Sequence, residues 1–218
     1  FLALGFVSKF FPIIYLPVLL IKQKTIKERI KIISVFLTTT VVINGYFMLS
    51  NFTGWSYFFS LNSIRNSNPD SIWTVLRFFI FDFSVDQINT ISLILFVMTF
   101  GWLIWRFRKA QFMTLCFIAT ILFLLFNKVF SPQYVLWLLP FLVVLPLNIK
   151  APFYTWEFSN LAALFAILPW FFTKDINYFY ASIPFVIIRH AALFVILVKA
   201  IGLARISDNL PEYSARRK

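Results

Sequence analysis

The chain has 218 residues, of which 61% are hydrophobic and only 13% are charged, and its formal net charge is +12. An average soluble domain has about 25% charged residues, so this composition excludes an ordinary soluble domain. The excess of lysine and arginine could indicate a nucleic-acid partner, but these residues lie in short clusters between apolar runs, which is the pattern of membrane proteins. We therefore predict an all-α, multi-pass membrane protein with no nucleic-acid partner.

The apolar runs define seven candidate membrane segments, which are judged against a hydrocarbon core of roughly 30 Å. They cover approximately residues 1–21, 31–49, 87–105, 111–127, 133–149, 158–173 and 183–204. Together they predict a single transmembrane domain over residues 1–218. Because Phe1 already lies within an apolar run, we expect this domain to be the C-terminal part of a longer chain.

The first segment contains two residues that disturb a simple membrane span, Lys9 and Pro12. Lys9 lies about 20 Å along a helix from Lys22, and a lysine at that depth faces a cavity or a partner instead of lipid. Lys9 is therefore a candidate substrate-binding residue. Since proline interrupts a regular helix, residues 1–21 form either one span or two half-helices.

The basic residues set the predicted orientation of the segments. Most of them lie in connections on one side of the alternating segments, namely 22–31, 106–109, Lys150 and the tail 205–218. The positive-inside rule places this side, and with it the C-terminus, in the cytoplasm. The opposite, extracytoplasmic side then receives the loop 50–86, the turn 127–133 and the loop 174–182.

The loop 50–86 is too long to be only a connection, and long loops are often functional. Within residues 71–80, Ile72, Val75, Leu76 and Phe79 share one helical face, and Asn68-Pro69-Asp70 supplies a start signal. We predict a helix that lies on the outer membrane surface. The tryptophan and tyrosine residues of the loop are expected at headgroup level.

The turn 127–133 joins a lysine to a helix start. Ser131 is a good N-cap and Pro132 a good first helical residue, so the free N–H groups of the new helix and Lys128 would point at the same spot. Such an arrangement binds anions, above all phosphate. The alternative is that Lys128 only extends to the membrane interface. The nearby Gln133 and Tyr134 favour a binding site.

Three further residues are candidates for binding or catalysis. Arg65 lies in a polar stretch of the outer loop, and its planar guanidinium suits phosphate. Arg77 has the same chemistry, but we interpret it as a solvated loop charge paired with Asp70. Arg189 and His190 lie within the last segment, at a depth where ionisable residues usually face the interior. His190 is either an acid–base group or a hydrogen-bonded packing residue.

The sequence offers little for a metal or a cofactor. One histidine and one cysteine do not suffice for the usual zinc or haem sites. We therefore predict neither.

The string NKVFSPQYVLWLLP at residues 127–140 resembles the late-chain motif of integral-membrane GT-C mannosyltransferases. The closest similarity is to the polyprenyl-phosphate-mannose-dependent α-mannosyltransferases and to the catalytic mannosyltransferase of glycosylphosphatidylinositol synthesis. Residues 5–12, with Lys9 and Pro12, are similar to the Lys-x-x-Pro segment of that family. The stretch 54–73 resembles its aromatic, arginine-containing outer loop.

This resemblance implies a membrane glycosyltransferase that takes a hexose, with mannose as the first candidate, from a polyprenyl or dolichyl phosphate. A lipid or a glycan accepts the sugar on the extracytoplasmic face. Lys128, Arg65 or the residues 131–134 would meet the phosphate, and Gln133, Tyr134 and Trp55 would orient the sugar or acceptor. The acidic catalytic base of the family lies in an earlier outer loop, and we expect it upstream of residue 1.

Two other functions stay open. A non-enzymatic transporter or flippase of lipid-linked sugars would need similar binding groups, but transporters more often contain symmetric pairs of interrupted segments. A structural membrane subunit would have no use for the outer polar cluster. Upstream sequence would separate these: an outer loop with an aspartate favours the enzyme, and an inverted copy of residues 1–150 favours transport.

Overall fold

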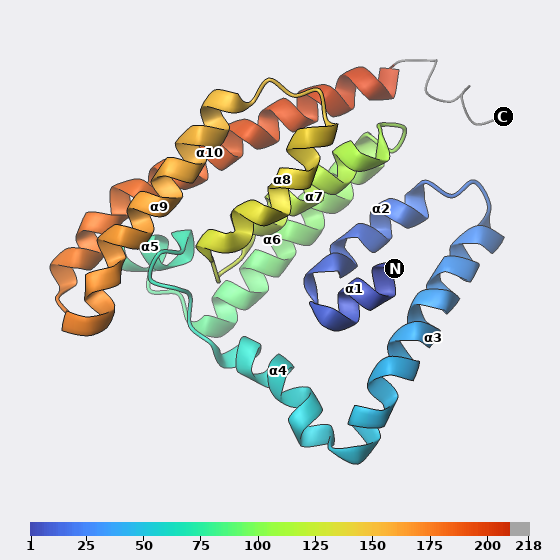
Figure 1. Ribbon diagram of the computed structural model, residues 1–218, viewed down its shortest axis with the longest axis horizontal. Helices are drawn as coiled ribbons and strands as arrows, with labels where there is room; N and C mark the ends of the chain where they lie inside the picture. The colour runs from blue at the N-terminus through green and yellow to red at the C-terminus, as the bar shows by residue number, and fades with distance from the viewer. Residues whose placement is uncertain (210–218) are drawn as a thin grey trace.

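The computed structural model describes residues 1–209, and these residues form ten α-helices, two short 3-10 helices and no strand (Figure 1). The α-helices are α1 (Leu2–Ser8), α2 (Leu16–Ile21), α3 (Ile26–Ser50), α4 (Phe52–Ile64), α5 (Ile72–Phe79), α6 (Val85–Arg106), α7 (Phe112–Phe126), α8 (Val135–Val144), α9 (Lys150–Thr173) and α10 (Ile176–Asn209). The 3-10 helices are η1 (Phe11–Tyr15) and η2 (Pro132–Tyr134). The predicted all-α class is confirmed. Of the predicted tail 205–218, residues 205–209 continue α10 and the others lie outside the described residues.

Within the described residues, three helices are long and apolar enough to cross a membrane: α3, α6 and α10. They correspond to three of the seven predicted segments. The predicted segments 111–127 and 133–149 form shorter apolar helices, α7 and α8. The segment 158–173 is part of α9, which already begins at Lys150. The structure thus supports three spans, and the finer count of about seven is not confirmed.

The first predicted segment, residues 1–21, is not one continuous span but is broken near Lys9, as the alternative of two half-helices predicted. Helix α1 ends at Ser8, Lys9 is extended with φ −147° and ψ 126°, and η1 begins at Phe11 with Pro12 in its first turn. The chain folds back so closely that a Cβ on Gly5 would lie 3.4 Å from Pro12 Cγ. Residues 1–21 therefore form short helical pieces, with Lys9 exposed at the break.

Helix α7 is the centre of the bundle. Ten of its fifteen residues are buried, which explains its composition, since it is apolar on every side. The buried residues of α7 pack against buried residues of α6, α8 and α10, and together they form the main hydrophobic core. Helices α9 and α10 form an antiparallel hairpin whose turn passes through Lys174, which has a positive φ of 58°. Helix α3 stands apart from the core and is mostly exposed.

The basic connections meet at one end of the bundle. Lys22 donates a hydrogen bond to the carbonyl oxygen of Arg108 at 2.8 Å, and the Lys109 N–H donates to Asp208 Oδ1 at 2.9 Å. Lys199 Nζ donates to Asn148 O at 3.1 Å. The loops after α2, α6 and α8 and the last turns of α10 are thereby held together.

The long loop 50–86 contains more helix than was predicted from the sequence. Helix α4 was not predicted. Its N-cap is Asn51, whose side-chain oxygen accepts a hydrogen bond from Gly54 N at 2.9 Å. Helix α5 was predicted over nearly the same residues, but its N-cap is Ser71, whose hydroxyl accepts from Trp73 N at 3.1 Å. Asn68-Pro69-Asp70 precedes this cap.

The buried face of α5 also differs from the prediction. Trp73 and Val75 are buried, whereas Phe79 is 58% exposed. Val75 packs in a small cluster with Phe179 and Ile183 of α10. Trp73 Nε1 donates to Phe126 O at 2.8 Å, so this tryptophan lies inside the protein. The α9–α10 hairpin provides a partner surface that the local pattern could not reveal.

Candidate functional site

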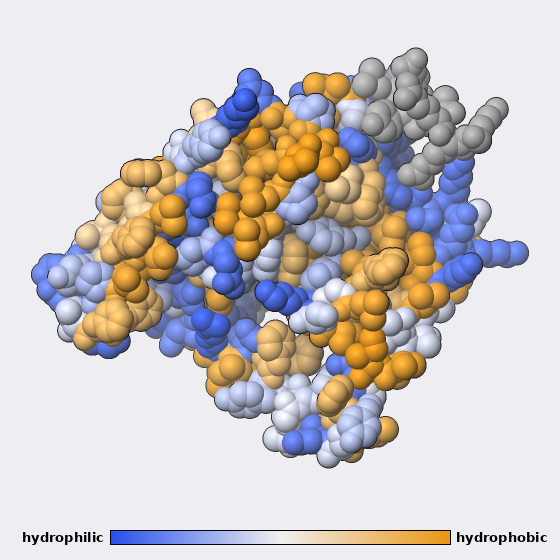
Figure 2. Space-filling model, in the orientation of Figure 1, coloured by the Kyte–Doolittle hydropathy of each residue, from blue (hydrophilic) through white to orange (hydrophobic). Residues whose placement is uncertain are grey.

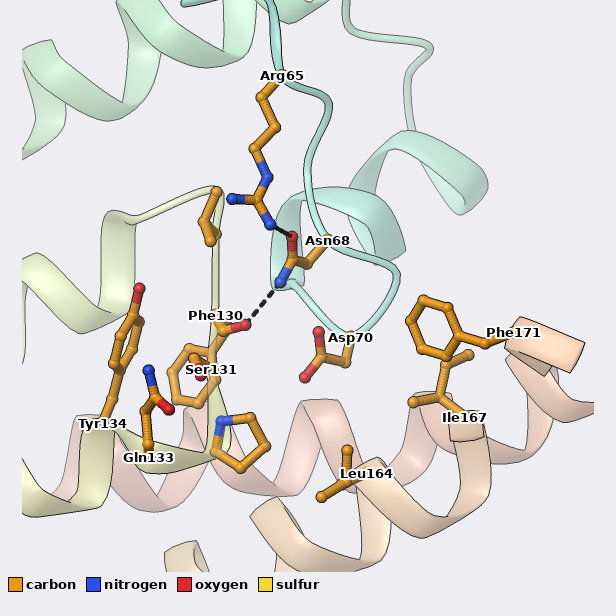
Figure 3. A pocket seen from close by; sticks show the side chains of 12 residues that line it. Arg65, Asn68, Asp70, Phe130, Ser131, Gln133, Tyr134, Leu164, Ile167 and Phe171 are labelled. Carbon is orange, nitrogen blue, oxygen red and sulfur yellow. Dashed lines mark hydrogen bonds between the residues drawn. The ribbon is translucent and has the colours of Figure 1, made fainter. Parts of the chain in front are cut away.

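Two segments far apart in the sequence meet at the end of the bundle opposite the basic connections. Asn68, in the loop between α4 and α5, joins them: its backbone N–H donates to Lys128 O at 3.1 Å, and its side-chain amide donates to Phe130 O at 2.7 Å (Figure 3). These bonds dock residues 65–70 onto the chain that leads into α8. The outer loop and the 127–140 motif, which were separate in the sequence, form one site.

A cavity of about 390 Å³ lies at this junction. Its lining comes from the α4–α5 loop, from the segment entering α8, and from α9: Arg65, Asn68, Asp70, Val129, Phe130, Ser131, Pro132, Gln133, Tyr134, Leu164, Ile167 and Phe171. In the view of Figure 2, hydrophilic surface gathers near the middle of the molecule, and hydrophobic surface lies on either side of it. The volume lies within the range of small-molecule sites.

Four of the nine predicted site residues line this cavity: Arg65, Ser131, Gln133 and Tyr134. Arg65 is its cation. One of its N–H groups donates to Asn68 Oδ1 at 3.1 Å. Since a guanidinium has five donors, this bond orients the group and leaves donors for a ligand. The exposed Arg65 stands beside the rim of the cavity in Figure 3.

Lys128 lies behind the cavity wall and not in its lining. It is 8% exposed, and its ammonium donates to the carbonyl oxygens of Asn62 at 2.8 Å and Ser63 at 3.5 Å. These carbonyls belong to the last turn of α4, where helix carbonyls lack partners and the dipole is negative. The structure thus gives Lys128 a role in fixing α4. Its predicted role as a direct phosphate ligand stays a prediction.

The charge of Lys128 nevertheless influences the site. Burial lowers the pKa of Lys128 below its ordinary value, and the positive charge of Arg65 acts in the same direction, while Asp86 opposes it. Each of the two positive charges disfavours the charged form of the other, and an anion bound nearby stabilises the charged form of both. A phosphate at Arg65 would therefore raise the pKa of Lys128.

Replacing Lys128 by methionine is expected to lower the free energy of unfolding by about 1–3 kcal/mol, because two carbonyl groups lose their donor. Methionine keeps most of the aliphatic stem. The measurement is thermal unfolding of the detergent-solubilised protein, with the exposed Lys150→Met as control. Equal unfolding temperatures for the two variants would contradict the structural role of Lys128.

The start of the motif helix differs from the prediction. Ser131 makes no side-chain capping bond, and the chain first forms η2 before α8 begins at Val135. The N–H of Tyr134 is already bonded to Ser131 O at 3.0 Å. The predicted side-chain cap at Ser131 is therefore not formed, and α8 does not begin directly at Pro132. The positive charge of the cavity comes from Arg65.

Arg189 is fully buried, at 0% exposure, beneath the cavity wall. Its guanidinium donates to Asp70 Oδ2 at 3.3 Å and to Asn160 Oδ1 at 3.1 Å, and it also bonds the backbone carbonyl of Asp70. It lies over the ring of Phe130, 3.8 Å from the centroid. Arg189 thus connects two cavity-lining residues, Asp70 and Phe130, to helix α10.

The sequence analysis missed Asp70 and Asn160 as site residues. Asn160 connects the parts of the site, because its amide donates to Pro132 O at 3.1 Å while its oxygen accepts from Arg189. An amide inside the apolar stretch of α9 was a usable signal, since polar residues there usually face the interior. Arg77, predicted to pair with Asp70, instead pairs with Asp82 at 2.8 Å.

Besides Lys128 and Arg189, three predicted residues lie outside the cavity lining. His190 is buried, its Nδ1 bonds the carbonyl of Val186 at 2.8 Å, and its Nε2 has no partner among the described residues. Trp55 of α4 donates a hydrogen bond to Asn44 Oδ1 of α3 at 3.0 Å. Lys9 lies at the break after α1, where the neighbouring Phe10 meets Phe59 of α4 with ring centroids 5.6 Å apart.

The described residues contain no group of three or more histidine, cysteine, aspartate or glutamate side chains that could hold a metal ion. Fold and site together define an all-helical protein with three helices able to span a membrane, and with a cavity at one end of its bundle that both polar and apolar residues line. Comparison with known protein families, curated proteins and solved structures gave no match.

Proposed function

We propose that this chain is part of a membrane glycosyltransferase that transfers a hexose, with mannose as the first candidate, from a polyprenyl or dolichyl phosphate to a lipid or glycan. The observation that carries the proposal is the cavity in which Arg65 stands beside polar groups of the 127–140 motif. A phosphate needs such a cation, and the lipid chain needs apolar helices next to it.

The chemistry follows from the position of the charge. In the transfer, the bond between the anomeric carbon and the phosphate oxygen breaks, and negative charge develops on the leaving phosphate. A fixed guanidinium that meets this charge lowers the barrier. Gln133 and Tyr134 supply hydrogen-bonding groups for the sugar or acceptor. The resemblance assigns activation of the acceptor hydroxyl to a carboxylate upstream of residue 1.

The topology forms part of the same proposal. The basic connections gather at one end of the bundle, and the positive-inside rule assigns that end to the cytoplasm. The cavity at the other end is then extracytoplasmic, where no nucleotide sugar is required. About seven membrane segments would result if residues 1–21 and helices α7, α8 and α9 also cross or enter the bilayer.

The test uses the full-length protein in liposomes with polyprenyl phosphate mannose that carries a labelled sugar. We expect label to appear in a glycosidic product, while a labelled nucleotide mannose gives none. Donor lipid that crosses the bilayer without any new glycosidic bond would identify a transporter instead. Absence of both transfer and donor binding would refute the proposal.

A further inference from the structure

We propose that Asp70 binds hydroxyl groups of the donor sugar and that Arg189 positions its carboxylate for this purpose. The inference rests on the proposed function and adds the orientation of the ligand. The phosphate lies at Arg65, and the sugar lies toward Asp70.

The two carboxylate oxygens of Asp70 have different surroundings. Oδ2 accepts from Arg189 at 3.3 Å, whereas Oδ1 accepts no hydrogen bond from the described residues. The side chain of Asp70 is 10% exposed, and the residue lines the cavity. Figure 3 shows the carboxylate between Phe130 and Leu164. One oxygen is therefore held by the protein and the other is available to a ligand.

The chemistry of a carboxylate limits what this ligand can be. An ionised carboxylate accepts hydrogen bonds but donates none, so Asp70 repels a phosphate and attracts hydroxyl groups. Arg65, in the same cavity, has the opposite preference. A molecule with an anionic group at one end and hydroxyl groups at the other satisfies both residues. A hexosyl phosphate has this form.

Arg189 fixes the position of the largely buried carboxylate. Its buried guanidinium lies at hydrogen-bond distance from Oδ2 of Asp70 and also bonds the backbone carbonyl of the same residue. Asn160 and the ring of Phe130 fix the guanidinium in turn. Arg189 does not line the cavity, so it is a positioning residue.

A purely structural ion pair is the competing explanation, and binding measurements separate the two. The experiment compares polyprenyl phosphate mannose with bare polyprenyl phosphate of the same length, each titrated onto the full-length protein in nanodiscs. Asp70→Asn is expected to weaken binding of the mannosyl lipid by about 10- to 100-fold, the range for a hydrogen bond to a charged group. Binding of the bare lipid should not weaken. The matched control is Asp82→Asn, which changes an exposed carboxylate outside the cavity.

The outcomes separate this inference from the proposed function. Failure of the wild-type protein to bind either lipid refutes the proposed function. If the wild-type protein binds the mannosyl lipid and Asp70→Asn binds it equally well, the function stands and the role of Asp70 is refuted.

A second measurement covers the case in which Asp70→Asn does not fold. The wild-type protein is titrated with a series of donors that each lack one mannose hydroxyl. At least one of them should bind about 10-fold more weakly than the parent donor. Equal binding of the whole series would overturn the inference.

Discussion

Replacing Arg65 by alanine is expected to reduce the rate of sugar transfer at least about 100-fold, the usual effect of removing one preorganised donor from a developing anion. Arg65 is the cation that lines the cavity, and the ammonium of Lys128 is already bonded to the carbonyl oxygen of Asn62. The measurement is the transfer of labelled sugar from polyprenyl phosphate mannose by the full-length protein in liposomes.

Two variants make this prediction specific. Arg65→Lys should retain part of the activity, because it keeps the charge but loses the planar fork of donors. Arg77→Ala removes the same side chain from an exposed ion pair with Asp82 and should transfer at the wild-type rate. Full activity of Arg65→Ala would exclude Arg65 as the phosphate contact.

The second large effect is expected on stability. Arg189→Met should lower the free energy of unfolding by about 3–5 kcal/mol, because it leaves the carboxylate of Asp70 without its charged partner in a buried position. Asn160 also loses a donor and Phe130 loses the cation over its ring. Thermal unfolding of the detergent-solubilised protein measures the change.

Arg205→Met is the matched control, since Arg205 lies on the same helix but is exposed. The double variant Arg189→Met with Asp70→Asn should recover part of the loss, because no unpaired charge remains. A double-mutant cycle converts this recovery into the interaction free energy between Arg189 and Asp70. A loss for Arg189→Met no larger than that of the control would contradict the ion pair.

The sequence allowed the prediction of features that depend on neighbours along the chain. The all-α class followed from the apolar runs, the break near Lys9 from a lysine and a proline inside one of them, and α5 from its helical period. The number of spans was harder to predict, because apolar runs do not show where helices end. Helices α7 and α8 are shorter than the runs that contain them.

The candidate site could be predicted only in part, because it depends on contacts between distant residues. Arg65 and the 127–140 motif were identified from their chemistry, but the bond that joins them passes through Asn68, 62 residues from Phe130. Arg189 and Asp70 are 119 residues apart, and no local pattern pairs them. Lys128 was identified from chemistry that suits phosphate. In the structure its ammonium instead donates to a carbonyl oxygen at the end of α4, a contact that the sequence does not reveal.

The most direct test of the central claim is a structure of the full-length protein in nanodiscs with polyprenyl phosphate mannose, determined by electron cryomicroscopy. The proposal predicts the phosphate at hydrogen-bond distance from Arg65 and the sugar beside Asp70, inside the cavity formed by the α4–α5 loop and the entry to α8. A sugar phosphate bound elsewhere, for example in the apolar cavity beside Cys116 and Tyr15, would contradict it.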